Sequence, residues 1–216
     1  MATWEWIDPH TEFDRLVDAF QRCGRALFQA NMNNSHSGNL SVRAGDHIWI
    51  KRTRTMCHEL TPDDIIKTTF VPTSEEQAQL SSEFIVHRAI YQATDYRAIV
   101  HCHALQAITL AFLVDEIIPP QIDGYGVLPG RIPVIEVVAA TASQELCDAL
   151  TPVMRQFPAV MVRGHGLFVG AESLDAATYR AFIVENAAQM LLTLHGLGVD
   201  MAPLLDKPYL KVGYPK

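Results

Sequence analysis

Two histidines separated by one residue follow a short apolar run near the middle of the chain, at Ala98-Ile99-Val100-His101-Cys102-His103. If this run is a β-strand, alternate side chains point to opposite faces, so His101 and His103 share one face and Cys102 lies on the other. Two imidazoles held side by side on rigid backbone form half of a transition-metal site. The same spacing also fits an ordinary pair of core or surface histidines.

A third histidine, His165, stands between Gly164 and Gly166, directly after the strand-like run 159–163. Glycines on both sides give the backbone unusual freedom and leave the imidazole with little steric cover. Structural turns rarely need a histidine in such a place. His165 is therefore a candidate third ligand.

Three polar segments could bind an anion. The corner Ser37-Gly38-Asn39 offers backbone N–H groups and an amide, and the run 51–54 is the most basic stretch of an acidic protein. Ser81-Ser82 precede a helical pattern whose free N–H groups could bind a phosphate, with Glu83 expected in its first turn. The ordinary alternatives are a turn, a solvated loop and a plain capped helix.

Hydrophobic periodicity predicts the elements that position these residues. We expect strands at 40–43, 47–51, 98–104, 132–135, 159–163 and 167–170, the first two as an antiparallel hairpin. We expect helices at 11–32, 84–90, 105–113, 141–150 and 173–194. Thr11 and Ser173 are the expected N-caps, and Gly196 is the expected stop of the last helix.

Composition limits the class of protein. With 216 residues and 49% hydrophobic content, the chain can bury one substantial core, and we expect a single domain spanning 1–216. A net charge of −7 argues against a nucleic-acid partner, and the apolar run 107–114 is too short to span a membrane. Four scattered cysteines and no visible secretory signal favour the cytoplasm. For the tail 201–216 two arrangements are open, a mobile segment or one that packs on a neighbouring subunit.

Taken together, the order Ser-Gly-Asn, Ser-Ser-Glu, His-x-His and Gly-His-Gly resembles the class II aldolase/adducin family, most closely its L-fuculose-phosphate aldolase branch. The resemblance covers roughly Phe13 to Gly198. It implies an α/β fold, a three-layer α/β/α sandwich with a largely antiparallel central sheet. It also implies a homotetramer with active sites at the subunit interfaces.

The resemblance also implies roles for individual residues. His101, His103 and His165 match the ligands of one divalent metal per subunit, usually zinc, although three imidazoles also accept Co²⁺ or Mn²⁺. Glu83 matches the acid that ligates the empty metal and transfers protons during turnover. The substrate phosphate is expected on Gly38, Asn39, Thr53, Ser81 and Ser82. Arg54 stands where the aldolases usually have glycine, and its guanidinium could strengthen phosphate binding or indicate a different anionic group.

A second acid/base group is less sharply defined. The family places a tyrosine from a neighbouring subunit a few residues after the Ile-Pro that follows the His-x-His helix. Counting from Pro119, that position falls near Asp123, with Tyr125 two residues further on. We take Tyr125 as the catalytic acid, with Asp123, Tyr209 and Tyr214 as alternatives.

The implied reaction is retro-aldol cleavage of a ketose 1-phosphate, fuculose-like or a 5-deoxypentulose phosphate, to dihydroxyacetone phosphate and an aldehyde. Three neutral imidazoles leave a zinc ion its full charge for stabilising an enediolate, and a nearby carboxylate can contribute roughly 10²–10⁴-fold by proton transfer. The alternatives within the family are a sugar-phosphate 4-epimerase, a methylthioribulose-phosphate type dehydratase and a decarboxylase. A non-catalytic, adducin-like interaction domain would not need the ligands that this chain keeps.

Overall fold

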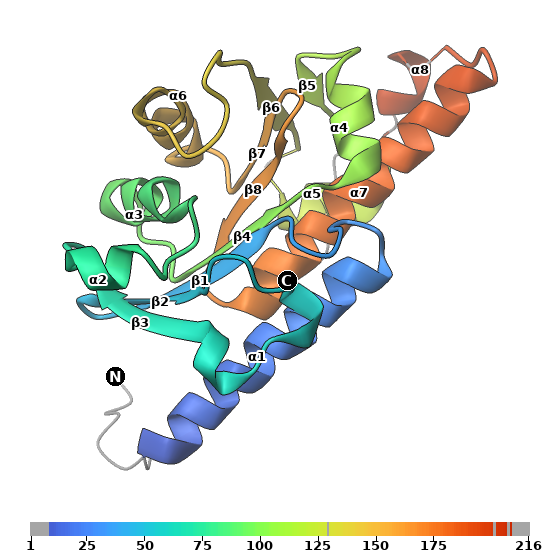
Figure 1. Ribbon diagram of the computed structural model, residues 1–216. Coiled ribbons are helices and arrows are strands. Elements are labelled where there is room, and N and C mark those ends of the chain that lie inside the picture. Colours follow the sequence, from blue (N-terminus) through green and yellow to red (C-terminus); the bar gives the residue numbers. More distant parts are fainter. Residues whose placement is uncertain (1–8, 129, 201, 207, 209–216) are drawn as a thin grey trace.

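Eight strands form one mixed sheet that lies between two layers of helices in the computed structural model, which describes residues 9–128, 130–200, 202–206 and 208 (Figure 1). The strand order is β3-β2-β1-β4-β8-β7-β6-β5. Neighbouring strands pair antiparallel except β6 and β7, which are parallel. The strands are β1 (Asn39–Ala44), β2 (His47–Lys51), β3 (Ile65–Thr69), β4 (Ala98–Cys102), β5 (Glu116–Ile117), β6 (Ile132–Ile135), β7 (Ala159–Val162) and β8 (Gly166–Ala171).

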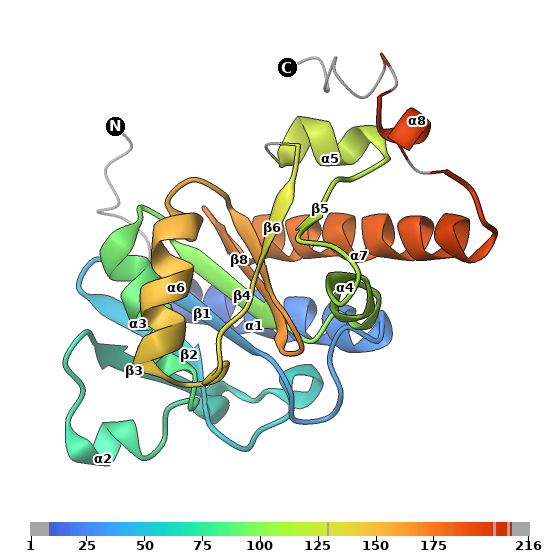
Figure 2. The ribbon, with the colours of Figure 1, turned by 90° about the horizontal axis from the view of Figure 1, so that it is seen from above.

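Helices cover both faces of this sheet, which confirms the predicted α/β/α sandwich with a largely antiparallel centre. Figures 1 and 2 show α3 and α6 on one face and α1, α4 and α7 on the other. The helices are α1 (Pro9–Gln29), α2 (Ser74–Gln77), α3 (Phe84–Ala93), α4 (Leu105–Ala111), α5 (Ile122–Val127), α6 (Gln144–Met154), α7 (Leu174–Gly196) and α8 (Ala202–Leu205), with 3-10 turns at Cys57–Glu59 and Pro62–Asp64. The described helices include none long and apolar enough to cross a membrane.

The predicted hairpin and the main helices are confirmed, but several predicted ends are wrong. Thr11 lies inside α1, which begins at Pro9 and so uses proline where its missing N–H costs nothing. Ser173 caps α7 as predicted, accepting from the backbone N–H of Ala176. The helix ends at Gly196, the predicted stop, and the glycine in the left-handed region after it is Gly198 (φ +72°).

The alternation of β4 divides the core into two clusters. Ala98, Val100 and Cys102 pack on the α1/α7 side, while Ile99 packs on the α3/α6 side. Cys102 is therefore buried opposite the face of Ile99 and His101, as the period of a strand requires.

Antiparallel pairing brings the candidate site residues to one end of the sheet. Asn39, the first residue of β1, pairs with His101 near the end of β4. Lys51 ends β2 beside the start of β1, and His165 lies in the turn between β7 and β8, next to β4. Residues from four separate parts of the chain thus meet at this end.

Glu185 of α7 caps α4, the helix that begins two residues after His103. Its carboxylate accepts from the backbone N–H groups of Gln106 (3.0 Å) and Ala107 (2.9 Å), and Ala104 offers no side-chain cap. We expect Glu185→Ala to lower the free energy of unfolding by about 1–2 kcal/mol, because the half-buried N–H of Gln106 and the buried N–H of Ala107 lose their partner. Urea denaturation measures this. The exposed Glu75→Ala is the control, and equal effects of both variants would contradict the capping role.

His87 is fully buried in the α3/α6 cluster, with Nδ1 at 2.6 Å from the hydroxyl of Ser41. Burial lowers its pKa to about 3. Because the unfolded chain gains a proton near pH 6.5 and the folded chain does not, stability falls as the pH drops below 6.5. The wild type should therefore lose free energy of unfolding between pH 7.5 and pH 5. We expect His87→Gln to make this loss smaller by about 2 kcal/mol, as measured by chemical denaturation at both pH values. An unchanged loss would contradict this origin.

Candidate metal and anion site

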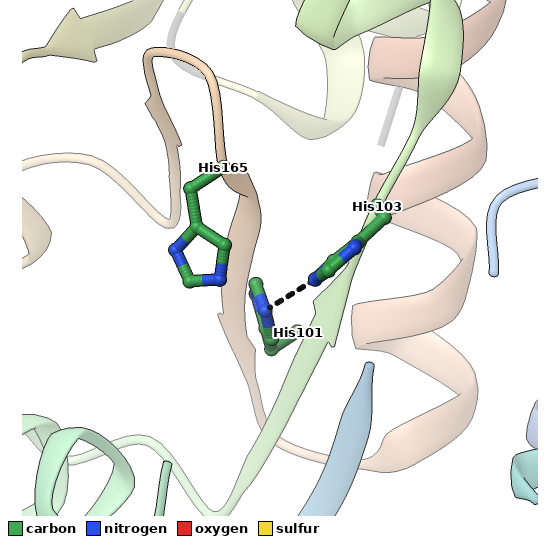
Figure 3. Close-up of side chains that lie close together, drawn as sticks. All are labelled: His101, His103 and His165. Carbon is green, nitrogen blue, oxygen red and sulfur yellow. Dashed lines mark hydrogen bonds between the residues drawn. The ribbon is translucent and has the colours of Figure 1, made fainter. Parts of the chain in front are cut away.

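His101, His103 and His165 point toward one another at the end of the sheet (Figure 3). One possible ligand atom from each lies within 4.8 Å of the others, and Nε2 of His101 and Nε2 of His103 are 3.2 Å apart. Tetrahedral zinc with Zn–N bonds near 2.05 Å places neighbouring nitrogens about 3.3 Å apart. The spacing of the first pair thus fits a tetrahedral metal ion.

The second ring nitrogen of His101 fixes its tautomer. A backbone carbonyl only accepts, so Nδ1 of His101 donates to the carbonyl oxygen of Leu167 at 3.2 Å. The proton on Nδ1 leaves the lone pair of Nε2 facing the cluster, which is the arrangement a metal-binding histidine needs. Phe168 stacks on the same ring, with centroids 4.1 Å apart.

Burial keeps all three imidazoles neutral. It lowers the pKa of His103 to about 4 and the pKa of His101 well below its ordinary value, and the other histidines of the cluster add to both shifts. Burial also lowers the pKa of His165, against the opposing charge of Glu83. Neutral imidazoles bind divalent metal ions. The three histidines therefore fit the divalent metal ion that the family resemblance implies.

The backbone around the cluster leaves no spare room. A Cβ on Gly166 would lie 2.7 Å from the carbonyl oxygen of Cys102 and 2.9 Å from Cε1 of His101. The amide of Asn33 accepts from the backbone N–H of His103 at 3.1 Å and thereby ties the end of β4 to the loop before β1. The second glycine of Gly-His-Gly is thus required by close packing.

A cavity of about 180 Å³ joins the three histidines to the predicted anion-binding segments. Its walls contain every predicted phosphate residue together with Glu83. They are formed by His36, Ser37, Gly38, Asn39, Lys51, Thr53, Arg54, Ser81, Ser82, Glu83, His101, His103, Thr141 and His165. Gly38 adopts φ +73°, and a Cβ there would collide with the side chain of Asn33.

Arg54 keeps a backbone conformation that suits glycine. Its φ is +62°, in the left-handed region, where an L-residue costs about 1–2 kcal/mol. The side chain is exposed and reaches the cavity wall. The backbone geometry is therefore glycine-like, while the side chain adds a guanidinium to the cavity.

Glu83 is buried at the start of α3, at the N-cap position and not in the first turn as expected. Its Oε1 accepts from the hydroxyl of Thr141 (2.5 Å) and from the N–H of Ala142 (2.9 Å). Its Oε2 is buried without a hydrogen-bond partner in the described part of the chain. The carboxylate is not a member of the three-histidine group.

Of the second acid/base candidates, only the side chain of Asp123 is described, and it lies away from the three histidines. Asp123 is on α5 and lines a different cavity, between α5 and α7, of about 650 Å³. Figure 2 shows α5 set apart from the sheet. Tyr125 is on the same helix, but its side chain, like Tyr209, Tyr214 and most of the tail 201–216, lies outside the described residues.

Sequence reasoning did not single out Lys51 and Thr141 as site residues. Lys51 belongs to the basic run 51–54 that the sequence indicates. Its place at the end of β2 buries it in the cavity wall, where it is 3% exposed, and the sequence alone does not predict this burial. Thr141 was expected to begin a helix. That prediction is wrong, because α6 begins at Gln144 behind the Ser143 cap and frees Thr141 for Glu83.

Comparisons with known proteins agree with this geometry. Residues 18–192 match the family model described as "Class II Aldolase and Adducin N-terminal domain". The chain is 29% identical over 189 residues to an L-fuculose phosphate aldolase of Haemophilus influenzae, covering 86% of each protein. It is 25% identical over 201 residues to a 5-methylthioribulose-1-phosphate/5-deoxyribulose-1-phosphate aldolase of Escherichia coli, covering 92% of each.

A solved structure supports the same assignment. The crystal structure of L-fuculose-1-phosphate aldolase from Thermus thermophilus superposes with a TM-score of 0.80 at 30% identity, covering 86% of this chain and 96% of that one. The sequence pattern, the sheet order and the three-histidine cavity therefore agree. The chain belongs to the class II aldolase and adducin family.

Proposed function

We propose that the protein is a zinc-dependent aldolase that cleaves a ketose 1-phosphate, fuculose-like or a 5-deoxypentulose phosphate, to dihydroxyacetone phosphate and an aldehyde. One observation carries this proposal. A single cavity holds three neutral imidazoles with metal-ligand spacing beside an anion cradle of glycine, amide, hydroxyl and cationic groups. A metal site alone would suit many reactions, whereas the pairing with an anion cradle suits a small phosphorylated substrate.

The cradle would anchor the phosphate through its donors. Asn39 is buried in the cavity wall, and the buried ammonium of Lys51 donates to the carbonyl oxygen of Arg52, at 3.3 Å. Burial lowers the pKa of Lys51, because its charge is held away from water. A bound phosphate dianion would supply an anionic partner for Lys51 and for Arg54.

His101, His103 and His165 would hold the metal ion, which when bound stabilises negative charge on substrate oxygens as a Lewis acid. Glu83 lies in the same cavity and has one carboxylate oxygen without a partner among the described residues, which suits it to accept and return a proton. Anchoring the phosphate fixes the reacting carbons relative to both groups.

The proposal includes the oligomeric state and the cellular compartment of the enzyme. Asp123 lies away from the cavity of its own subunit, which supports a homotetramer in which a neighbouring subunit supplies the second acid/base group from Tyr125, Asp123 or the tail. The cysteines of the chain are free and buried, as suits the reducing cytosol.

Incubating the zinc-loaded protein with L-fuculose 1-phosphate and with 5-deoxyribulose 1-phosphate tests the reaction, with coupled detection of dihydroxyacetone phosphate. Release of dihydroxyacetone phosphate from either substrate supports the aldolase. Water loss, epimerisation or CO₂ release without dihydroxyacetone phosphate would replace it by the dehydratase, epimerase or decarboxylase of the same family. A well-folded protein that takes up no metal would favour a non-catalytic interaction domain.

A further inference from the structure

Asn33 links the three-histidine group to the anion cradle, although it is not one of the described residues that line the cavity. It lies in the loop between α1 and β1 and is 4% exposed. Its Oδ1 accepts from the backbone N–H of His103, 70 residues along the chain, at 3.1 Å. Its amide also lies against Gly38, where an added Cβ would be 2.4 Å from both Nδ2 and Oδ1. One buried side chain therefore contacts a residue of each half of the site.

The hydrogen bond to His103 continues the support of β4 beyond the end of the strand. β4 ends at Cys102, and its pairing with β1 stops where Asn39 faces His101. His103 lies beyond this pairing, and a buried or half-buried backbone N–H needs an acceptor. The amide of Asn33 supplies that acceptor. Because the imidazole extends from this backbone, the position of the His103 ring depends on Asn33.

Asn33 also supports the turn that begins the anion cradle. Gly38 has φ +73° and leads the chain from the loop into β1 at Asn39. Within the loop, Asn34 and Ser37 exchange two hydrogen bonds between backbone and side chain, each 2.9 Å long. These bonds close the turn on itself, whereas the contact of Gly38 with Asn33 connects the turn to the end of β4. A displacement of the turn is therefore transmitted to the end of β4.

The orientation of the Asn33 amide is fixed by chemistry. The backbone N–H of His103 can only donate, so the amide oxygen faces it and Nδ2 does not. Nδ2 is buried without a hydrogen-bond partner in the described part of the chain, which costs free energy. A leucine would have a similar size without this cost, but it could not accept from His103. The amide thus serves its contacts at a cost to stability.

We propose that Asn33 couples the two halves of the site. A divalent ion that binds His103 also fixes Gly38 through the Asn33 amide, and an anion bound at Gly38 fixes His103 in return. Such coupling is reciprocal, so each ligand raises the affinity for the other by the same factor. Asn33 is a positioning residue, since it acts through these two neighbours. This inference rests on the metal and phosphate sites of the proposed function.

Titration calorimetry with inorganic phosphate, on the metal-free and the zinc-loaded protein, tests the coupling. The ratio of the two dissociation constants is the coupling factor, which should be at least about fivefold in the wild type. Asn33→Leu should reduce this factor by at least about threefold. Direct attraction between zinc and phosphate is present in both proteins, so it cancels in the comparison. Chelator competition for zinc, with and without phosphate, should give the same factor for each protein.

Ser173→Ala is the matched control for a general loss of stability. It removes the cap of α7, away from the site, and should keep the wild-type coupling factor. Asn33→Ala serves in place of Asn33→Leu if the leucine variant does not fold. An unchanged factor in Asn33→Leu, or an equal reduction in Ser173→Ala, would overturn the coupling, while release of dihydroxyacetone phosphate would still support the aldolase. Failure of the wild type to bind zinc would overturn the metal site and the coupling together.

Discussion

Replacing His103 with alanine should abolish stoichiometric metal binding. Its Nε2 lies 3.2 Å from Nε2 of His101, within the three-histidine group. Loss of a group that merely orients a ligand weakens metal binding by about 10–100-fold, so loss of a ligand should cost more than about 100-fold. Metal content after dialysis, and a competition titration with a chromophoric chelator, measure the loss. Aldol cleavage should fall by at least the same factor at limiting metal.

The control for this prediction is a histidine far from the cluster. His195 lies in the last turn of α7 and is exposed, so His195→Ala should leave metal content and activity unchanged. The backbone N–H of His103 donates to Asn33, a contact that the alanine variant keeps, so the fold should survive. Full metal retention in His103→Ala would exclude this cluster as the metal site.

Replacing Lys51 with methionine should change stability and substrate binding in opposite directions. The ammonium is buried, its pKa is lowered by burial, and its hydrogen-bond partner is the backbone carbonyl of Arg52. Removing a buried charge that is paired with a neutral acceptor should raise the free energy of unfolding at pH 7 by about 1–3 kcal/mol. Losing a charged hydrogen-bond donor should raise KM for the proposed ketose 1-phosphate substrate by about 10–150-fold.

The pH dependence gives a second signature of Lys51. The unfolded chain keeps its lysine protonated up to about pH 10.4, whereas the folded chain releases the proton earlier. The burial penalty is therefore complete below the lowered pKa and shrinks as the pH rises from that pKa toward the unfolded value of about 10.4, above which it is lost. The stability gain of Lys51→Met should shrink on moving from pH 7 toward pH 10. Lys67→Met, on the exposed face of β3, is the matched control. A destabilised Lys51→Met with unchanged KM would contradict both parts.

Local patterns in the chain are enough to predict most elements and the residue types of the site. The hairpin β1–β2 follows from alternation around a Gly-containing turn, and Ser173 caps α7 because a hydroxyl satisfies a free N–H. The two-residue period of a strand predicts that His101 and His103 share a face, and their Nε2 atoms do meet, although β4 ends at Cys102 and not at the predicted residue 104. The fold, and the place of His165 beside the other two histidines, were predicted from the order of the motifs, because that order resembles one family.

Other features depend on contacts between distant segments and could not be predicted from the chain alone. In the sequence, Lys51 is one basic residue of a basic run. The strand order of the sheet is what buries it beside the site. In the sequence, Thr141 fits the start of a helix. In the structure, Ser143 caps that helix, and the hydroxyl of Thr141 donates to the carboxylate of Glu83 instead. Counting from Pro119 puts Asp123 near the position of the family's second acid/base group. In the structure, however, α5 places Asp123 beside α7 and away from the histidines. Periodicity and capping are set by neighbours in sequence, whereas burial, hydrogen-bond partners and access to a cavity are set by strand order, which no local pattern encodes.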